Sequence, residues 1–192
     1  MKIALVSGEF PPMEGGVGAY TQEIARAFAA QKHEVHIITS RSAGSNPQRQ
    51  RFGRLPEPSD LGFAQMHATI GRWRWPSVAT IADLTLRYEF DVVNIQYQAA
   101  AYNMKSPAIN LLPWRLKHLT RTIVTFHDLR TPYLFPKVGR LREKAVLFMA
   151  RQAAGIITTN SADFDSLKEV VNAPLATIPI GSNIEAYQPN HI

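Results

Sequence analysis

The sequence predicts a doubly wound α/β domain, with a mainly parallel, Rossmann-like sheet and helices on both faces. Short apolar or β-branched runs alternate along the chain with segments of helical periodicity. Several of these runs are continuously apolar, which is typical of parallel strands that are covered on both faces. The first run leads through a glycine-containing turn into an amphipathic segment and then a second run. This order indicates a strand–loop–helix–strand unit.

Six strands and five helices are expected. The strands are predicted at residues 3–7, 35–39, 92–95, 123–126, 156–159 and 176–180. The first helix follows the glycine turn and is expected to bury one face, formed by Tyr20, Ile24, Ala27, Phe28 and Gln31. Further helices are predicted at 77–88, 109–119, 140–153 and 162–171. In the fourth helix Leu141, Ala145, Phe148 and Met149 share a face, and Ser161 is expected to cap the last helix.

Two segments interrupt this alternation. Residues 41–61 are rich in Ser, Pro, Gly, Gln and Arg and are expected to form a long mobile loop after the second strand. Residues 130–139 mix prolines, aromatic residues and basic residues after the strand at 123–126. Both segments leave the carboxyl ends of strands, where open α/β sheets bind their ligands. Long loops at such positions are often functional.

The composition is that of one soluble globular domain. The chain has 192 residues, of which 45% are hydrophobic and 19% charged. Since there is no cysteine, disulfides, thiolate metal sites and a cysteine nucleophile are excluded. No apolar run reaches the roughly 18 residues of a membrane span, and no signal-peptide cleavage pattern is present. We therefore expect a cytoplasmic protein.

The net charge of +6 is concentrated in one part of the chain. Between Lys105 and Arg151 there are ten Lys or Arg residues against two acids. Such a stretch is a solvated basic face, a site for phosphorylated substrates, or a surface for peripheral contact with an anionic membrane. No nucleic-acid partner is expected, because the three tryptophans do not form a basic–aromatic repeat and no nucleic-acid-binding motif is found.

The glycine turn is a candidate anion site. Gly15, Gly16 and Gly18 lie at the predicted helix start, where unpaired amides and the helix dipole favour a negative charge. Two prolines and two acids precede these glycines, which distinguishes the turn from the dinucleotide fingerprint, and the Lys-Ser/Thr ending of a Walker A loop is missing. Arg41 after the second strand could accept a 2′-phosphate, so an NADP-dependent oxidoreductase stays open.

The order of the motifs resembles a known family. They are FPP, GGVGAYTQEIARAFAAQKHEVHIIT, DVVNIQYQ, TIVTFHD, GIITTNSADFDSL and ATIPIGSNI. In this order and spacing the chain is similar to the N-terminal domain of retaining family 4 (group 1) glycosyltransferases, enzymes of the B-type fold with two facing Rossmann-like domains. The resemblance spans roughly residues 1 to 187.

The resemblance implies roles for particular residues. Gly15, Gly16, Val17 and Gly18 would contact a phosphate of the nucleotide-sugar donor or of the acceptor through their backbone amides. His127 would be a catalytic residue that lines the cleft near the donor sugar, where it binds a sugar hydroxyl or orients the reacting carbon. Asp128 beside it would accept a hydrogen bond from the imidazole or from a backbone amide.

Further candidates are polar groups near strand ends. Glu9 and Glu14 could bind acceptor hydroxyls, and Gln96, Tyr97 and Gln98 end the strand that contains NIQYQ. Asn160 and Ser161 occupy the family position after the strand at 156–159. Each also has an ordinary structural explanation, as a solvent-facing carboxylate, a strand-end packing residue or a helix cap. The histidines other than His127 (His33, His36, His67, His118 and His191) are expected to be surface or packing residues.

The resemblance covers only half of an enzyme. The family binds its donor mainly with a second domain that carries a basic residue and two glutamates separated by seven residues, and this chain has no such pair. We therefore expect residues 1–192 to be a single acceptor-side N-terminal domain, inactive alone, with the C-terminal donor-binding domain absent.

The implied reaction is sugar transfer from a nucleoside-diphosphate sugar to a sugar or a lipid-linked acceptor, with retention, in carbohydrate biosynthesis. No cofactor or metal is expected, because histidines and acids do not cluster at ligand spacing. The remaining alternative is a non-catalytic binding or regulatory half-domain.

Overall fold

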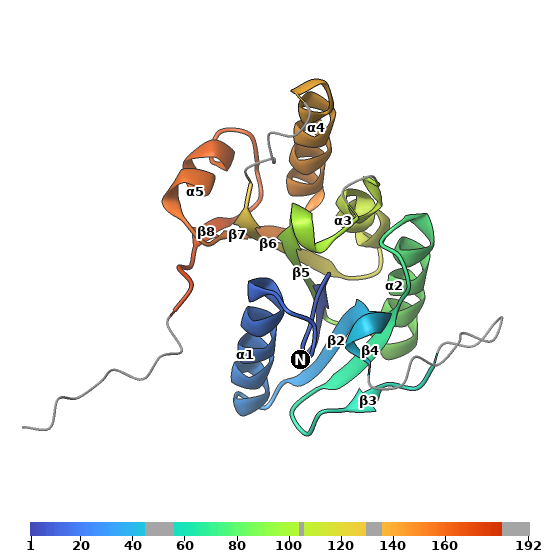
Figure 1. Ribbon diagram of the computed structural model, residues 1–192. Coiled ribbons are helices and arrows are strands. Elements are labelled where there is room, and N and C mark those ends of the chain that lie inside the picture. The colour runs from blue at the N-terminus through green and yellow to red at the C-terminus, as the bar shows by residue number, and fades with distance from the viewer. Residues whose placement is uncertain (45–55, 104–105, 130–135, 182–192) are drawn as a thin grey trace, which may run out of the picture.

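The computed structural model describes residues 1–44, 56–103, 106–129 and 136–181, and in the last segment it describes side chains from residue 141. These residues form one sheet of eight strands in the order β3-β4-β2-β1-β5-β6-β7-β8 (Figure 1). All neighbouring strands are parallel except β3, which runs antiparallel to β4. The doubly wound, mainly parallel α/β fold is thus confirmed.

The six predicted strands are all present, and two more flank them. The strands are β1 (Lys2–Ser7), β2 (Glu34–Ser40), β3 (Ser59–Asp60), β4 (Gln65–Ile70), β5 (Val92–Gln98), β6 (Arg121–Asp128), β7 (Gly155–Thr158) and β8 (Leu175–Thr177). The sequence analysis did not predict β3 or β4. Gln65 and His67 break the apolar run in β4, and the buried His67 contacts His36 and Tyr88, which come from other elements of the fold.

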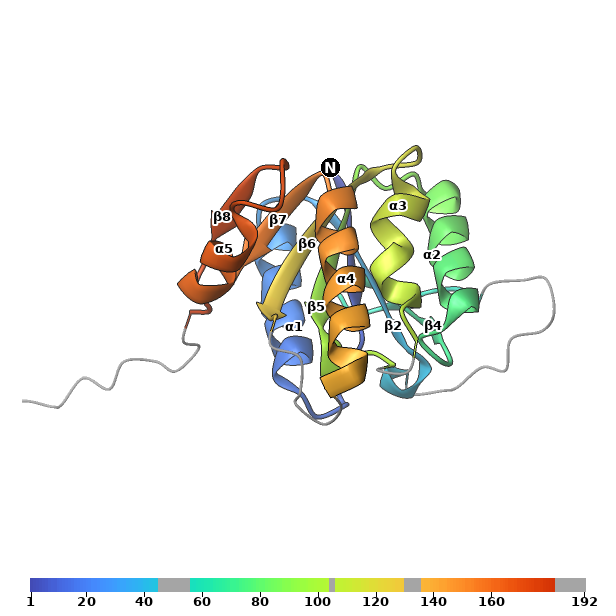
Figure 2. The same ribbon diagram turned by 90° about the horizontal axis from the view of Figure 1, so that it is seen from above.

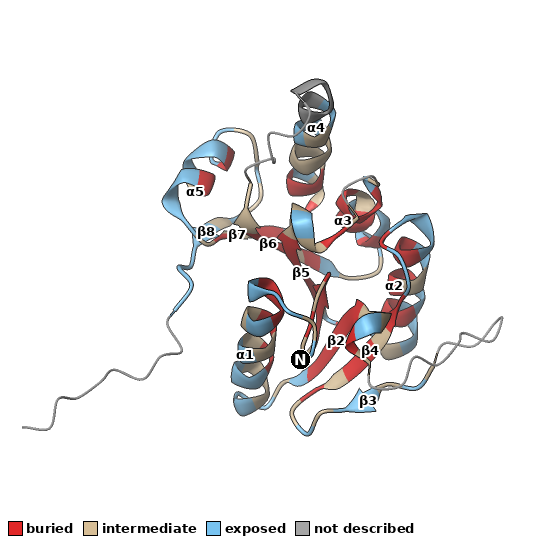
Figure 3. Ribbon diagram, viewed as in Figure 1, coloured by how far each residue is buried: buried red, intermediate tan, exposed pale blue. Residues whose placement is uncertain are grey.

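The helices lie on both faces of the sheet, as predicted. They are α1 (Gly16–Ala30), α2 (Trp75–Tyr88), α3 (Leu112–Leu116), α4 (Pro136–Gln152) and α5 (Ser161–Leu167), with short 3₁₀ turns η1 (Arg41–Ala43), η2 (Ala99–Ala101) and η3 (Ala108–Leu111). Among these elements α1 covers one face, while α2 to α5 cover the other (Figures 1 and 2). The sheet therefore separates two apolar layers (Figure 3).

The residues that α1 buries against the sheet differ from those predicted. Its fully buried residues are Val17, Gly18, Thr21 and Ala25, whereas Ala27 is exposed. These small side chains let the helix approach the sheet closely, and a Cβ at Gly18 would lie 3.1 Å from the Cα of Phe10. The start of α1 is thereby held against the loop that follows β1.

The prediction of which side chains of the fourth helix are buried is also wrong at the beginning of the helix. Leu141 is 70% exposed, while Met149 and Ala150 near the other end of α4 are fully buried. The helix therefore packs on the sheet mainly through its last turns, with Val146 and Leu147 adding partly buried contacts.

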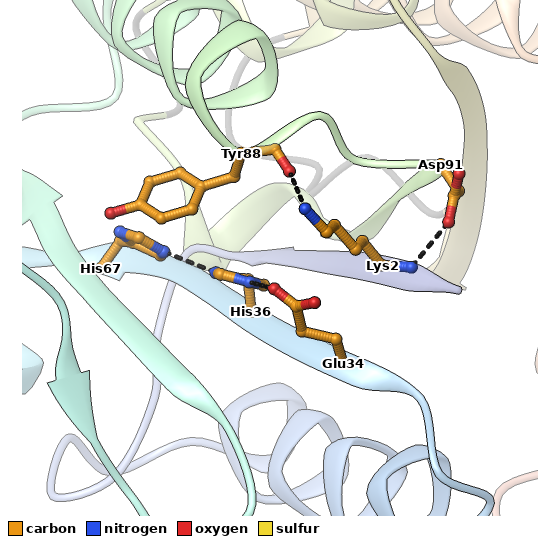
Figure 4. A network of polar contacts seen from close by, with 6 residues as sticks. All are labelled: Lys2, Glu34, His36, His67, Tyr88 and Asp91. Atoms are coloured by element: carbon orange, nitrogen blue, oxygen red, sulfur yellow. Dashed lines mark hydrogen bonds and ion pairs between the residues drawn. The ribbon is translucent and has the colours of Figure 1, made fainter.

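A polar network joins elements at the amino-terminal edge of the sheet (Figure 4). The Nδ1 atom of His36 lies 2.9 Å from Nε2 of His67, and Nε2 of His36 lies 3.0 Å from Oε1 of Glu34. The side chain of Lys2 donates to the carbonyl of Tyr88 at 3.2 Å. Both rings are buried, which confirms His36 and His67 as packing residues. The network ties β1, β2 and β4 to the end of α2.

The two predicted loops are shorter in the described residues than the sequence suggests. The turn η1 and strand β3 occupy both ends of the first, and residues 45–55 lie outside the described residues. Helix α4 begins inside the second, and residues 130–135 lie outside the described residues. In the described part of the chain we find no helix with the length and apolar character needed to cross a membrane.

Candidate functional site

His127 is the centre of a polar cluster at the carboxyl ends of the central strands. It is the penultimate residue of β6, and its Nε2 lies 2.9 Å from Oε1 of Gln96 on β5. On the other side its ring meets Tyr20 of α1 edge-on, with ring centroids 4.8 Å apart and planes at 80°. Two strands and the first helix therefore fix the orientation of the imidazole.

The environment of this cluster keeps it uncharged. Burial lowers the pKa of His127 to about 4, so the imidazole is neutral at pH 7. Burial also raises the pKa of Tyr20. When Oε1 of Gln96 accepts the hydrogen bond, Nε2 of His127 carries the proton and Nδ1 is left as an acceptor. In the described part of the chain the fully buried Nε2 of Gln96 has no hydrogen-bond partner. The site thus offers neutral donors and acceptors, which suit hydroxyl groups.

The glycine turn is arranged differently from the expectation of open amides. Oε1 of Glu9 accepts hydrogen bonds from the amides of Val17 at 3.1 Å and of Gly18 at 3.3 Å. A Cβ at Gly15 would overlap this carboxylate, whereas one at Gly16 would meet nothing within 4 Å. A carboxylate of the chain itself therefore occupies the anion position that the helix start creates. Glu14, the other acid of this loop, is exposed.

The side chain of Tyr97 points to the opposite face of the sheet from that of His127. It is only 6% exposed, and its hydroxyl accepts a hydrogen bond from Nδ2 of Asn110 at 3.2 Å. Its ring packs edge-on against Phe126 in the apolar layer under α2 to α4. Successive residues of a strand point to opposite faces, so Gln96 faces the site and Tyr97 the core. The expectation that Tyr97 lines the site is therefore wrong, while Gln98 is half-buried at the end of β5.

The start of α5 supports the chain that follows His127. Asn160, not Ser161 as expected, is the N-cap, and its side chain accepts from the amide of Asp163 at 2.8 Å. Oδ2 of Asp163 accepts from the amide of Leu129 at 3.2 Å and from Nδ2 of Asn160 at 2.9 Å. These bonds hold the end of β6 against α5. His127 Nε2 is bonded to Gln96 rather than to Asp128.

The described residues offer no candidate metal centre. No group of three His, Asp or Glu side chains in the described ranges could hold a metal ion. Asp163 and Asp165 are two residues apart on α5, but Asp163 is buried in the bonds just given and Asp165 is exposed and pairs with Lys168 at 2.9 Å.

One residue of the cluster, Tyr20, was missing from the predicted site, and Gln96 was only one of several candidates at strand ends. Tyr20 had been assigned to the apolar face of the first helix, and Gln96 had been treated with its neighbours as a strand end. Strand alternation is the signal that finds Gln96. It pairs in register with Thr125, which lies two residues before His127 and so on the same face.

The comparisons with known proteins now identify the kind of domain. Residues 15–181 match the family described as "Glycosyl transferase 4-like domain". The chain belongs to this family. The glycosyltransferase resemblance of its motifs is thereby confirmed at the level of the domain. A comparison with curated proteins found no match.

Solved structures share the fold of this glycosyl transferase 4-like domain. Sucrose-phosphate synthase from Thermosynechococcus elongatus has a TM-score of 0.65 at 18% identity over 95% of this chain. A glycosyltransferase from Rickettsia africae has a TM-score of 0.54 at 16% identity, also over 95%. The domain spans 48% of the length of the former and 43% of the latter. At such identities the likeness establishes the fold.

Proposed function

We propose that this glycosyl transferase 4-like domain is the acceptor-side half of an enzyme that transfers a sugar from a nucleoside-diphosphate sugar to an acceptor with retention. The observation that carries the proposal is the neutral His127, fixed between Gln96 and Tyr20 at the carboxyl edge of the sheet. The family match supports glycosyl transfer as the chemistry. Retention is supported by the resemblance of the motif order alone.

His127 acts in this proposal by hydrogen bonding. Its Nδ1 accepts from a sugar hydroxyl, while Nε2 stays bonded to Gln96. A neutral imidazole adds no positive charge beside a sugar carbon that develops oxocarbenium character in the transition state. Tyr20 holds the ring from the side of α1, so that its direction is set before the substrate binds. Asp128 follows directly in β6 and contributes to the same edge.

The glycine turn serves the phosphate side of the reaction. We infer that a substrate phosphate displaces the carboxylate of Glu9 from the amides of Val17 and Gly18. Gly16 leaves open space beside these amides, since a Cβ there would have no neighbour within 4 Å. Donors held in place by the fold would then stabilise the charge that develops on the leaving diphosphate.

A second α/β domain completes the site in this proposal. Support comes from the length of the similar proteins, of which this domain spans 48% and 43%. The second domain would bind most of the donor and supply its cationic groups, so the isolated domain is expected to be inactive. The transfer would need no metal or other cofactor.

The acceptor is proposed to be a sugar or a lipid-linked sugar. The basic stretch between Lys105 and Arg151 suits an anionic membrane surface, and in it Trp114 is 48% exposed beside the exposed Arg115. If this surface meets a membrane, binding of the protein to anionic vesicles should weaken steeply between low and physiological salt. Binding that is absent or independent of salt would contradict peripheral attachment.

A titration of the full-length protein tests the proposed reaction class. Nucleoside-diphosphate sugars of several bases are added while the tryptophan fluorescence is followed, and NADPH is added in a parallel series. We expect saturable binding of one nucleotide sugar, product formation in the presence of EDTA, and no binding of NADPH. Binding of NADPH without any nucleotide sugar would overturn the proposal in favour of an oxidoreductase.

A further inference from the structure

We propose that Asp163 and Thr159 are positioning residues, whose side chains hold the backbone that carries His127 during sugar transfer. Thr159 follows β7 directly, and Asp163 lies in the first turn of α5. Both side chains form hydrogen bonds with the end of β6. The role rests on the proposed function, in which His127 binds a hydroxyl of the reacting sugar, and it extends the site to residues that act through His127.

The main-chain pairing between β6 and β7 ends before β6 does. The last pair in register is Phe126 with Thr158, and β6 continues through His127 and Asp128. One more main-chain bond follows, from the amide of Thr159 to the carbonyl of Phe126 at 3.2 Å. Backbone groups beyond this point need partners other than β7, because unpaired backbone groups away from water are unfavourable.

The register of the pairing with β5 also passes over His127. Tyr97 lies opposite Phe126, and Gln98 lies opposite Asp128, so the register shifts at this place. Such an extra residue in one strand is a bulge, and the ladder does not set the direction of its backbone. The residue at the centre of the candidate site therefore stands where neither neighbouring strand pairs with its backbone in register.

Two side chains support the backbone at this point. Oγ1 of Thr159 donates to the carbonyl of His127 at 3.3 Å, and Oδ2 of Asp163 accepts from the amide of Leu129 at 3.2 Å. These bonds hold the chain at His127 itself and just after Asp128. They take the place that ladder hydrogen bonds have in the regular part of β6.

The carboxylate of Asp163 is itself fixed in direction. The residue is 6% exposed, and its Oδ2 also accepts from Nδ2 of Asn160 at 2.9 Å. In return the amide of Asp163 donates to Oδ1 of Asn160 at 2.8 Å. This reciprocal pair anchors the side chain at the start of α5, where the helix dipole favours a negative charge. The bond to Leu129 therefore ties the end of β6 to a fixed point on α5.

A fixed imidazole matters for the proposed reaction because catalysis depends strongly on geometry. A misplacement of about 1 Å can lower a rate by about 100-fold, even when its cause lies away from the reacting atoms. Gln96 and Tyr20 already contact the ring of His127. Thr159 and Asp163 add the hold on the backbone, so their loss should affect turnover more than substrate binding.

Turnover of the full-length protein at saturating donor and acceptor tests this role. Asp163→Ala removes the acceptor for the amide of Leu129 and should lower kcat by about tenfold with little change in KM. Asp163→Asn keeps an oxygen that can accept the same bonds and should restore most of the loss. Asp165→Ala changes an exposed acid on the same helix and is the matched control. Equal kcat of Asp163→Ala and Asp165→Ala would overturn the proposal.

A double-mutant cycle shows whether Asp163 acts through His127. In the His127→Ala background, Asp163→Ala should lower kcat by less than about twofold, because the ring that it positions is gone. A loss of about tenfold in both backgrounds would show that Asp163 acts independently of His127, and would overturn the proposal.

The hydroxyl of Thr159 offers a second and structurally milder variant. Thr159→Val removes the bond to the carbonyl of His127 at nearly the same side-chain volume, whereas Thr159→Ser keeps the hydroxyl. We expect Thr159→Val to lower kcat several-fold relative to Thr159→Ser. Equal kcat of these two proteins would overturn the proposal, and this holds even if Asp163→Ala fails to fold.

NMR of the His127 ring needs no substrate, so it separates a failure of this proposal from a failure of the proposed function. Burial lowers the pKa of His127 to about 4, and a ring that is held less firmly is more exposed. The pKa should therefore rise toward 6.5 in Asp163→Ala and stay near 4 in Asp165→Ala. If the unchanged protein transfers no sugar but this rise is seen, the hold on His127 stands and only the proposed function fails. An unchanged pKa in Asp163→Ala would overturn the proposal.

Discussion

Oε1 of Glu9 lies 3.1 Å from the amide nitrogen of Val17, so the anion position at the start of α1 is filled by a side chain of the same loop. The same oxygen accepts from Gly18, which places one carboxylate on two amides. An incoming phosphate therefore competes with an internal anion and does not enter an empty site. This competition makes Glu9 a determinant of phosphate affinity as well as of local stability.

Replacing Glu9 should separate these two effects. Glu9→Ala removes the carboxylate and should lower the free energy of unfolding by about 1 kcal/mol, as for other lost helix-start contacts. At the same time it frees the amides of Val17 and Gly18 and should raise the affinity for pyrophosphate, measured by calorimetry. Glu14→Ala is the control, because this neighbouring acid is exposed. An equal gain of affinity in both variants would show that the loss of any nearby negative charge has this effect, and would contradict a specific competition by Glu9 for the amides.

The protonation of His127 can be followed directly by NMR. Since burial lowers its pKa to about 4, its ring signals should titrate near pH 4 and remain constant through neutral pH. Tyr20→Ala removes the ring that covers the imidazole on the side of α1 and should move the pKa upward, toward 6.5. Titration of His127 near 6.5 in the unchanged protein would show that the imidazole is not buried as described.

The histidine pair at the amino-terminal edge should make the protein sensitive to acid. Burial, with smaller contributions from His36 and Arg87, lowers the pKa of His67 from 6.5 to about 3. Between these two pH values the unfolded chain binds a proton at His67 that the folded chain does not bind. The contribution of His67 to the free energy of unfolding is therefore fully present above pH 6.5 and is lost as the pH drops toward 3. By pH 5 this histidine alone should cost about 2 kcal/mol.

Urea unfolding at several pH values measures this loss. His67→Gln keeps a side chain that can bond to Nδ1 of His36 and should flatten the decline between pH 6.5 and 5. His118→Gln changes an exposed histidine and should leave the decline as it is. The account of the pair is wrong if His67→Gln leaves the pH dependence unchanged.

Two neighbouring variants test which residue caps α5. Asn160→Ala removes the bond to the amide of Asp163 and the bond from its Nδ2 to Oδ2 of Asp163. It should lower the free energy of unfolding by about 1 kcal/mol. Ser161→Ala should be close to neutral, because Ser161 is the first helical residue and not the cap. Thermal unfolding of both proteins decides between them, and the reverse order would restore Ser161 as the cap.

The fold was predictable because its signals are local. The continuous apolar run of β1 and the helical periodicity of the segments between the strands can be recognised in the sequence without knowing which elements pack together. Strand β4 was not predictable in this way. Its His67 is buried by contacts with His36 and Tyr88, which come from other parts of the chain.

The candidate site was predictable only in part. His127 could be selected from the sequence by the resemblance of its motif, but its partners depend on the pairing of β5 with β6 and on the approach of α1. The bond between Glu9 and Val17 spans a loop whose conformation no sequence pattern specifies. Tyr97 was assigned to the site because strand ends attract polar residues, although its own position in the alternation points it into the core.

The central claim is that His127 contacts the reacting sugar, and turnover of the full-length protein tests it most directly. His127→Ala is compared with His118→Ala, which changes an exposed histidine, at saturating donor and acceptor. We predict that His127→Ala lowers kcat by about 100-fold, in the range of losses for a transition-state hydrogen bond, while circular dichroism shows the fold retained. Equal turnover of the two variants would contradict the account and remove His127 from the site.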